Sequence, residues 1–328
     1  MRRAASRLSS VGILERAVRG ARPTAAEEAE LARWLLSDPT QTGFFRVTAD
    51  GIGRVVGERL RALLRVHAAL ATALDVAGYT ERPSCSLEEV FRFHLPLAQW
   101  LLSRVTTGRR RTLVAIAGLP AGGKSVFTAL LARVLCALSP PFGLAAVGLD
   151  GYHYPNAHLL AHRAPPGLVA EGPLKLYKGA HFTFDAARLA ADLARVLEAD
   201  KPVALPAYDR TIHDPVEGRI LIQPDVRLVL VEGNYLLYRK DGWERLAGLF
   251  DLGIFLDLPA GANREPMIAR HMRGGRSRED AVRHFERVDR FNTDLIAATR
   301  LEADIVVELA ADYAVMAIAL QRRDRIAG

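Results

Sequence analysis

The chain has 328 residues, of which 50% are hydrophobic and 25% are charged, and its formal net charge of +7 is carried almost wholly by arginine. This composition can form a sizeable core and excludes wholesale disorder, and the length suits one large domain with an accessory layer. Two cysteines are too few for a disulfide framework or a zinc site, and no apolar run reaches the length of a membrane span.

The first third of the chain, residues 1–108, is predicted to be helical. A capping box opens an amphipathic helix over residues 24–36, and a second periodic segment covers about 52–74. Another capping box at residues 86–89 precedes a helix in which Pro96 is expected to introduce a kink. We expect a helical layer packed on the domain that follows. A separate partner-binding domain is the alternative.

From residue 112 onward, strand and helix patterns alternate, which predicts an α/β fold with a mostly parallel sheet covered on both faces. Residues 151–180 form a loop-rich insertion, and a polar excursion follows residue 205. The strand at 305–307 is expected to close the sheet. The predicted strands are 112–118, 144–149, 203–205, 219–222, 227–231, 252–256 and 305–307, and the predicted helices are 124–138, 184–197, 262–272 and 279–298.

A phosphate-binding loop lies between the first of these strands and its helix. The segment GLPAGGKS fits the pattern Gly-x-x-x-x-Gly-Lys-Ser between a β-branched apolar run and an apolar-periodic helix. Glycines allow backbone N–H groups to surround phosphate oxygens, and the helix directs its positive end toward them. Lys124 can reach the β- and γ-phosphates, and the Ser125 hydroxyl can bind Mg²⁺. The predicted nucleotide-binding residues are Gly118, Ala121, Gly122, Gly123, Lys124, Ser125 and Val126, with ATP and Mg²⁺ as the cofactors.

Two carboxylates follow other strands of the predicted sheet, Asp150 after residues 144–149 and Glu232 after residues 227–231. Ligands of open α/β sheets collect beyond the carboxyl ends of the strands, so both should share one rim with the phosphate-binding loop. Asp150 would accept the proton of an acceptor hydroxyl, and Glu232 would hold Mg²⁺. The alternative for each is a carboxylate that caps a loop.

Further candidates surround this rim. An Arg-rich joint between two predicted helices, residues 270–278, has the composition of a mobile lid that delivers guanidinium groups to a transferring phosphate. A charged helix–helix turn is the alternative. The lid candidates are Arg270 and Arg273, and the predicted acceptor contacts are Tyr152, His153, Lys178, Tyr208, Arg210, Asn234 and Asn292.

The segments GLPAGGKS, LDGYHYPN, KGAHFTFD, PAYDRTIHDPV, QPDVRLVLVEGNYLL and RHMRGG together resemble the phosphoribulokinase/uridine kinase/pantothenate kinase superfamily. The DGYHYPN box is similar to bacterial type I pantothenate kinases. The stretch from PAYDR onward is similar to nucleoside or sugar kinase-like proteins assigned to fructose transport systems. The resemblance covers roughly residues 85–310 and implies a three-layer P-loop NTPase fold.

By resemblance, Asp150 is the base, Glu232 belongs to the metal network, and Arg270 or Arg273 serves the lid. Asn292 matches an asparagine that contacts substrate in pantothenate kinases. The chain departs from those enzymes at Arg210, where they carry a histidine. It also departs near Met267, where they carry a lid aromatic, and in a shorter segment before Asn292. These departures leave phosphoryl transfer intact but question the vitamin as acceptor.

We therefore predict two regions, 1–108 and 109–328, and an ATP- and Mg²⁺-dependent kinase for a hydroxyl of a small polar metabolite. A pantothenate-like alcohol is the first candidate acceptor, a sugar or nucleoside the next, and a nucleotide-dependent ATPase switch is the alternative of another class. The longest basic run, residues 109–111, lacks interleaved aromatics, so no nucleic-acid partner is expected. We expect a cytoplasmic protein without a membrane partner, with a homodimer as one possible assembly; the Arg- and Ser-rich start leaves organelle import as the alternative.

Overall fold

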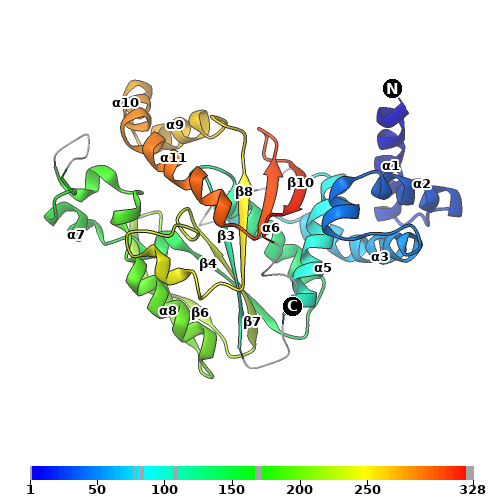
Figure 1. Ribbon diagram of the computed structural model, residues 1–328, viewed down its shortest axis with the longest axis horizontal. Coiled ribbons are helices and arrows are strands. Elements are labelled where there is room, and N and C mark those ends of the chain that lie inside the picture. The colour runs from blue at the N-terminus through cyan, green and yellow to red at the C-terminus, as the bar shows by residue number, and fades with distance from the viewer. Residues whose placement is uncertain (1, 77–78, 82–84, 106–109, 167–171, 323–328) are drawn as a thin grey trace.

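The computed structural model describes residues 2–76, 79–81, 85–105, 110–166 and 172–322. Its centre is a six-stranded sheet in the order β10-β9-β8-β3-β7-β4 (Figure 1). Neighbouring strands run parallel except β10, which pairs with β9 in the antiparallel direction. The strands are β3 (Thr112–Gly118), β4 (Gly143–Gly148), β7 (Val226–Glu232), β8 (Leu252–Asp257), β9 (Ile305–Leu309) and β10 (Val315–Leu320). The predicted α/β class is confirmed.

Two details of the predicted sheet are wrong. Residues 305–307 do not close it, because β10 adds an outer strand beyond β9. The segments predicted at 203–205 and 219–222 form a separate antiparallel ribbon of β5 (Val203–Asp209) and β6 (Asp214–Ile222). Short apolar runs reveal strands but not which strands they pair with, so the sequence pattern could not separate a ribbon from the parallel sheet.

The four helical segments predicted after β3 form near the expected places, but a further short helix, Asn156–Ala161, lies in the insertion that was predicted to be loop-rich. The predicted segment 279–298 forms a continuous helix in which one π-helical turn lies between two α-helical parts. The α-helices are α6 (Lys124–Ala137), α7 (Asn156–Ala161), α8 (Ala186–Glu198), α9 (Arg264–Arg273), α10 (Arg278–His284) and α11 (Arg290–Ala298). The shorter turns are η3 (Leu149–Tyr152), η4 (Leu174–Tyr177), η5 (His181–Thr183), η6 (Trp243–Leu246), η7 (Phe285–Asp289, π-helical) and η8 (Thr299–Glu302).

Most of residues 1–108 are helical, as predicted. The capping box forms, since Glu27 N–H donates to Thr24 Oγ1 at 3.3 Å and Thr24 N–H donates to Glu27 Oε2 at 2.7 Å. The predicted helix 52–74 is too long, because it ends at Leu70 and a short hairpin follows. The elements are α1 (Arg2–Val18), α2 (Ala25–Leu36), η1 (Thr40–Phe44), α3 (Ile52–Leu70), β1 (Leu74–Val76), β2 (Tyr79–Glu81), α4 (Leu87–Glu89), η2 (Val90–His94) and α5 (Leu95–Arg104).

Pro96 lies in the first turn of α5, directly after the π-helical turn η2, where the sequence predicts a kink. A proline has no N–H to donate to the carbonyl one turn earlier, so the Arg92 carbonyl needs another partner. Gln41 supplies it, with Nε2 donating to Arg92 O at 2.7 Å. The irregular turn thereby ties η1 to η2.

The two faces of β3 belong to two different cores. Val114 and Ile116 point into a core shared with the N-terminal helices, whereas Leu113, Ala115 and Ala117 point into a core on the opposite face. This alternation is the two-residue period of a strand. Figure 1 shows α1, α2 and α3 on one side of the sheet and the helices α7, α9 and α10 toward the other. The N-terminal helices therefore complete one face of the sheet, and the boundary predicted between residues 108 and 109 lies outside the described residues.

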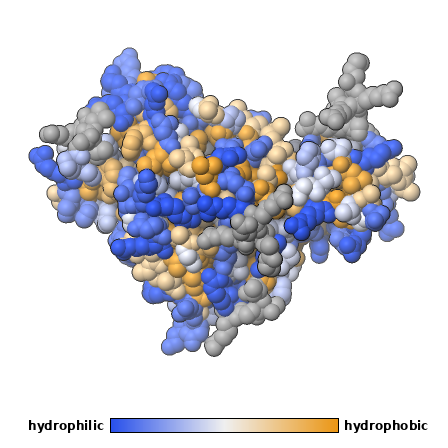
Figure 2. Space-filling model, in the orientation of Figure 1, coloured by the Kyte–Doolittle hydropathy of each residue, from blue (hydrophilic) through white to orange (hydrophobic). Residues whose placement is uncertain are grey.

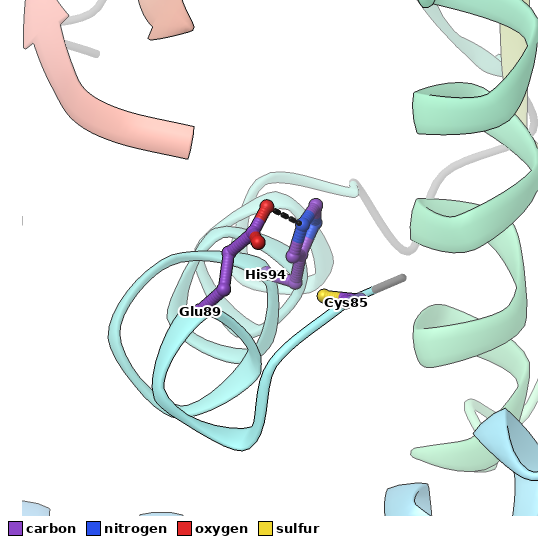
Figure 3. Close-up of side chains that lie close together, drawn as sticks. All are labelled: Cys85, Glu89 and His94. Atoms are coloured by element: carbon purple, nitrogen blue, oxygen red, sulfur yellow. Dashed lines mark hydrogen bonds and ion pairs between the residues drawn. The ribbon is translucent and has the colours of Figure 1, made fainter. Parts of the chain in front are cut away.

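A buried polar cluster links the helical layer to the domain that follows (Figure 3). His94 Nε2 and Glu89 Oε1 are 3.2 Å apart, and the same Glu89 oxygen accepts from Val315 N–H at 3.0 Å. The His94 ring packs against Phe127 of α6, 5.4 Å between centroids. Burial and the nearby Glu89 carboxylate raise the pKa of the Cys85 thiol, which keeps it protonated and unreactive. The cluster thus joins α4 to β10 through Glu89 and η2 to α6 through His94.

No helix in the described part of the chain is both long and apolar enough to cross a lipid bilayer. On the face shown in Figure 2, hydrophilic residues interleave with hydrophobic ones. Two residues of the basic run at 109–111 lie in the described part of the chain, and they do not form a basic surface patch. Arg110 pairs with Asp251, and Arg111 is buried.

Arg111 holds the start of β3 against its neighbours. Its guanidinium donates to the carbonyls of Val226 at 3.0 Å, Ala199 at 2.8 Å and Gln223 at 3.2 Å, and its side chain is 1% exposed. The Arg111→Met variant should lower the free energy of unfolding by about 3 kcal/mol, because several buried carbonyls lose their donor. Urea denaturation would measure this. Arg110→Met, which removes an exposed ion pair, should cost less than about 1 kcal/mol, and equal losses would contradict the assignment.

Candidate active site

The phosphate-binding loop has the backbone that its glycines predict. Gly123 adopts φ 79° as the residue before α6, and Ala121 adopts φ 52°. A Cβ atom on Gly122 would lie 2.7 Å from Leu119 O, so the loop closes too tightly for any side chain there. Lys124 Nζ donates to Leu119 O at 2.7 Å and points into this loop. The loop thus encloses a cationic cradle that fits the phosphates of a nucleotide.

Two residues that sequence reasoning missed hold this loop from outside. Tyr313 OH donates to Ala121 O at 3.1 Å, and its ring would lie 3.0 Å from a Cβ atom on Gly123. Asn263 is buried, and its Nδ2 donates to Pro120 O at 3.3 Å. Tyr313 comes from the turn between β9 and β10, and Asn263 immediately precedes α9. No local pattern signals either contact, because both depend on how distant strands pair.

Gly122→Ala tests the cradle directly. The added methyl group must displace the Leu119 carbonyl, which is backbone and cannot rotate away as a side chain would. We expect nucleotide affinity to fall at least about tenfold, because the loop N–H groups lose their common orientation. Fluorescence titration with a labelled ADP would measure it. Gly248→Ala, where a Cβ atom meets nothing within 4 Å, is the matched control and should bind as the wild type does.

Glu232, at the end of β7, faces the start of α6. Ser125 Oγ donates to Glu232 Oε1 at 3.0 Å. Burial raises the pKa of Glu232, and the carboxylate of Asp150 adds to this effect, while Lys124 opposes it. A hydroxyl and a carboxylate side by side are hard oxygen ligands of the kind that Mg²⁺ takes. These two residues therefore fit a magnesium ion, and the raised pKa shows that the carboxylate would gain from a nearby cation.

Asp150 lies in η3, just past β4, two strands from β3 in the sheet. Its carboxylate is partly open to solvent, and Arg210 Nη2 is 3.6 Å from Oδ2. Burial opposes ionisation of this carboxyl group, but His153, Arg270, Arg210 and Lys124 outweigh burial and lower its pKa. Asp150 is therefore ionised at neutral pH and can accept a hydrogen bond from a hydroxyl group.

His153 forms a wall beside Asp150. Its ring packs on Phe184 at 3.8 Å and on Tyr208 at 5.6 Å between centroids, and Nδ1 lies 3.0 Å from the Asp150 carbonyl oxygen. Burial lowers the pKa of His153 to about 4, so the ring is neutral at neutral pH. At neutral pH the positive charges around the Asp150 carboxylate are therefore those of Arg210, Arg270 and Lys124.

The predicted lid spans the end of α9 and the start of α10. Both lid arginines are exposed, but Arg270 is near enough to lower the pKa of Asp150 and Lys124, whereas none of the contacts described around Asp150 involves Arg273. Met267 is 5% exposed and packs with Ile268 in a small core of the lid. Of the two lid arginines, only Arg270 influences the pKa of these two groups.

No family model matches the chain. It is 31% identical over 307 residues to a pantothenate kinase of Sorangium cellulosum, covering 80% of this chain and 94% of that protein. It is 30% identical over 207 residues to a proposed uridine kinase of Schizosaccharomyces pombe, covering 61% and 84%. A proposed fructose transport system kinase from Silicibacter sp. TM1040 matches in structure with a TM-score of 0.54 and 30% identity, over 62% of this chain and 94% of that one.

The chain belongs to the phosphoribulokinase/uridine kinase/pantothenate kinase superfamily of P-loop kinases. This confirms the predicted resemblance and the prediction of a small-molecule kinase. In this P-loop kinase the cradle, Glu232 and Asp150 lie at one rim of the sheet, as expected from the ends of β3, β7 and β4.

The acceptor contacts predicted for this kinase divide between its site and its core. Tyr152 was predicted as a contact, but it is 1% exposed and its hydroxyl donates to Asp192 Oδ2 at 3.2 Å. It therefore belongs to the core on the face of the sheet opposite the N-terminal helices. Asn292 is 3% exposed in α11, and its Oδ1 has no partner among the described residues. Its role toward a substrate stays a prediction.

Three other predicted contacts of the kinase, Lys178, Tyr208 and Arg210, lie near Asp150, and a fourth, Asn234, follows β7. Lys178 Nζ lies 4.9 Å from the centroid of the Tyr208 ring, and Tyr208 in turn contacts His153. Arg210 follows β5 and pairs with Asp150. Asn234 is half-buried two residues past Glu232. Lys175, which sequence reasoning missed, joins this group beside Lys178.

Proposed function

We propose that this kinase transfers the terminal phosphoryl group of ATP, with Mg²⁺, to a hydroxyl group of a small polar metabolite. The observation that carries the proposal is the ionised Asp150 carboxylate, which shares one rim of the sheet with Lys124, Glu232 and Arg270. When bound, ATP would supply the phosphoryl group and Mg²⁺ would offset its charge. A cytoplasmic location belongs to the same proposal and rests on composition alone.

Each residue has one task in this proposal. Lys124, in the cradle, binds phosphate oxygens, and Ser125 with Glu232 holds the metal. Asp150 orients the acceptor hydroxyl and takes its proton, and its low pKa keeps it ready at neutral pH. Arg270, which approaches from α9, stabilises charge on the transferring group.

The proposal also names a class of acceptor molecule. The relative named pantothenate kinase aligns over most of both chains, which supports a pantothenate-like alcohol. The proposed uridine kinase and the proposed fructose transport system kinase support a nucleoside or a sugar. Arg210, beside Asp150, places a fixed positive charge next to the acceptor hydroxyl in this chain. We keep pantothenate as the first candidate.

ADP release with and without added acceptors tests the proposal. The panel contains pantothenate, sugars and nucleosides, each at a fixed ATP and Mg²⁺ concentration. Release that an acceptor stimulates at least about tenfold supports a kinase for that class of acceptor. Slow release that no acceptor changes, but that a protein partner alters, would instead support an ATPase switch acting through the helices of residues 1–108.

A further inference from the structure

Two lysines project from one short turn beside the acceptor side of Asp150. Lys175 lies within the 3₁₀ turn η4, and Lys178 directly follows it. Residues three apart in a 3₁₀ turn eclipse one another, so the two side chains leave on the same face. The Nζ atoms of Lys175 and Lys178 both donate to the same oxygen, Asn156 Oδ1. The bond from Lys178 is 2.8 Å long. We call Lys175 and Lys178 the lysine pair.

The lysine pair is held by neutral oxygens. Lys178 Nζ also donates to the His213 carbonyl at 2.8 Å, and among the described residues neither lysine forms an ion pair. Asp214 is the nearby carboxylate, but its Oδ1 accepts the Asn156 N–H at 2.8 Å. Two ammonium groups that share one amide oxygen repel each other, and an anion between them would relieve that repulsion.

Partial burial strengthens this argument. Burial and, to a lesser extent, the neighbouring charge of Lys175 lower the pKa of Lys178 to about 8, although Asp214 and Asp150 oppose this effect. A surface lysine whose only task is to hold a loop would keep its charge at little cost in open water. The lysine pair instead keeps positive charge in a half-buried setting without a matching carboxylate partner.

The lysine pair lies on the acceptor side of the kinase. Lys178 sits over the Tyr208 ring, Tyr208 contacts His153, and His153 bonds to the Asp150 carbonyl. The Asp150 carboxylate is close enough to influence Lys178. A molecule whose hydroxyl meets Asp150 would therefore have the lysine pair close beside it.

We propose that the lysine pair is an anion subsite for the acceptor, so that the alcohol phosphorylated by this kinase carries a carboxylate or a phosphate group besides its hydroxyl. The inference rests on the proposed function and narrows its substrate class. Hydroxy acids and sugar phosphates fit this subsite, whereas free sugars and nucleosides leave it without its anion.

Matched pairs of acceptors test the class. The pairs are pantothenate with panthenol, glycerate with glycerol, ribose 5-phosphate with ribose, and uridine 5′-monophosphate with uridine, and ADP release is followed at saturating ATP and Mg²⁺. We expect the anionic member of the preferred pair to exceed its neutral partner by about 10- to 100-fold in kcat/KM, the effect of one or two charge-assisted hydrogen bonds. Equal stimulation by both members would overturn the anion subsite while leaving the kinase proposal intact. The carboxylate and phosphate pairs distinguish the two sources of charge.

A binding arm separates the subsite from turnover. Calorimetric titration of the same acceptors is done with the cradle saturated by a non-hydrolysable ATP analogue and Mg²⁺. The double variant Lys175→Met/Lys178→Met should lose the preference for anions about 10-fold or more, and Lys175→Arg/Lys178→Arg should keep most of it. Lys201→Met, at an exposed lysine, is the control. Anion binding that is unchanged in the double methionine variant, with a thermal melt like that of the wild type, would overturn the inference even if every acceptor failed to turn over.

Discussion

Asp150→Asn should lower kcat by about 10²- to 10⁴-fold, the usual contribution of a general base, while the affinity for ATP changes little. The amide keeps the size of the carboxyl group and can still accept a hydrogen bond, but it cannot take a proton at neutral pH. ATP affinity should persist because the cradle around Lys124 is built from β3 and α6 rather than from η3. Single-turnover kinetics and nucleotide titration separate the two effects.

The matched control is Asp209→Asn. This carboxylate lies at the end of β5, where it accepts from Thr211 N–H at 2.8 Å and pairs with Arg219 at 3.2 Å, and none of the contacts described around Asp150 involves it. It should keep kcat within about threefold of the wild type. Turnover that is unchanged in Asp150→Asn would remove Asp150 from the base role and leave it as a partner that positions Arg210.

The pH profile gives a second check on Asp150. Its pKa is lowered from 3.8 because the surrounding cations outweigh its burial. The acidic limb of kcat that comes from Asp150 therefore lies below that value, and the carboxylate is fully available at neutral pH. A base with an apparent pKa of about 6 to 7, seen in the wild type and lost in another variant, would contradict this assignment.

The site residues that local sequence could predict are those at the ends of strands. The glycine loop, Asp150 and Glu232 each follow an apolar run, and parallel topology brings such ends to one rim whatever the order of the strands. The orientation of neighbours within a turn could not be predicted. Tyr152 and His153 are adjacent in sequence, yet one enters the core and the other lines the site, because the η3 turn rotates the chain between them.

Contacts between segments that are distant in the sequence could not be predicted either, because local patterns do not show how such segments pack together. Tyr313 reaches Ala121 across 192 residues, and its position depends on β10, which the periodicity did not reveal. The lysine pair depends on a 3₁₀ turn inside a loop-rich insertion, where hydrophobic periodicity carries no signal. The helical layer was predicted as helices, but its link to α6 through His94 and Phe127 appears only when the two are packed together.

Lys124→Met should abolish measurable turnover and weaken ATP binding together, in contrast to Asp150→Asn. Lys124 is 8% exposed, and its ammonium group is the cation inside the cradle, near the carboxylates of Glu232 and Asp150. Removing it takes a positive charge from both the bound phosphates and the transferring group. We expect kcat/KM to fall by about 10³-fold or more. Lys240→Met, at an exposed lysine, should leave it unchanged.

Although Lys124→Met should lose activity, we expect it to gain stability at neutral pH. Burial lowers the pKa of Lys124 from 10.5 to about 8, so the folded protein binds its proton less tightly than the unfolded chain does. At pH 7 the buried ammonium group therefore costs stability, and this cost disappears as the pH rises from about 8 to 10.5, where only the unfolded chain still holds the proton. Lys124→Met should be more stable than the wild type at pH 7, by up to about 3 kcal/mol, and should lose that advantage at high pH. Urea denaturation at several pH values would measure the difference. A variant that is less stable at pH 7 would mean that the bond from Nζ to Leu119 O outweighs desolvation, and the cradle would then be a structural support as well as a binding site.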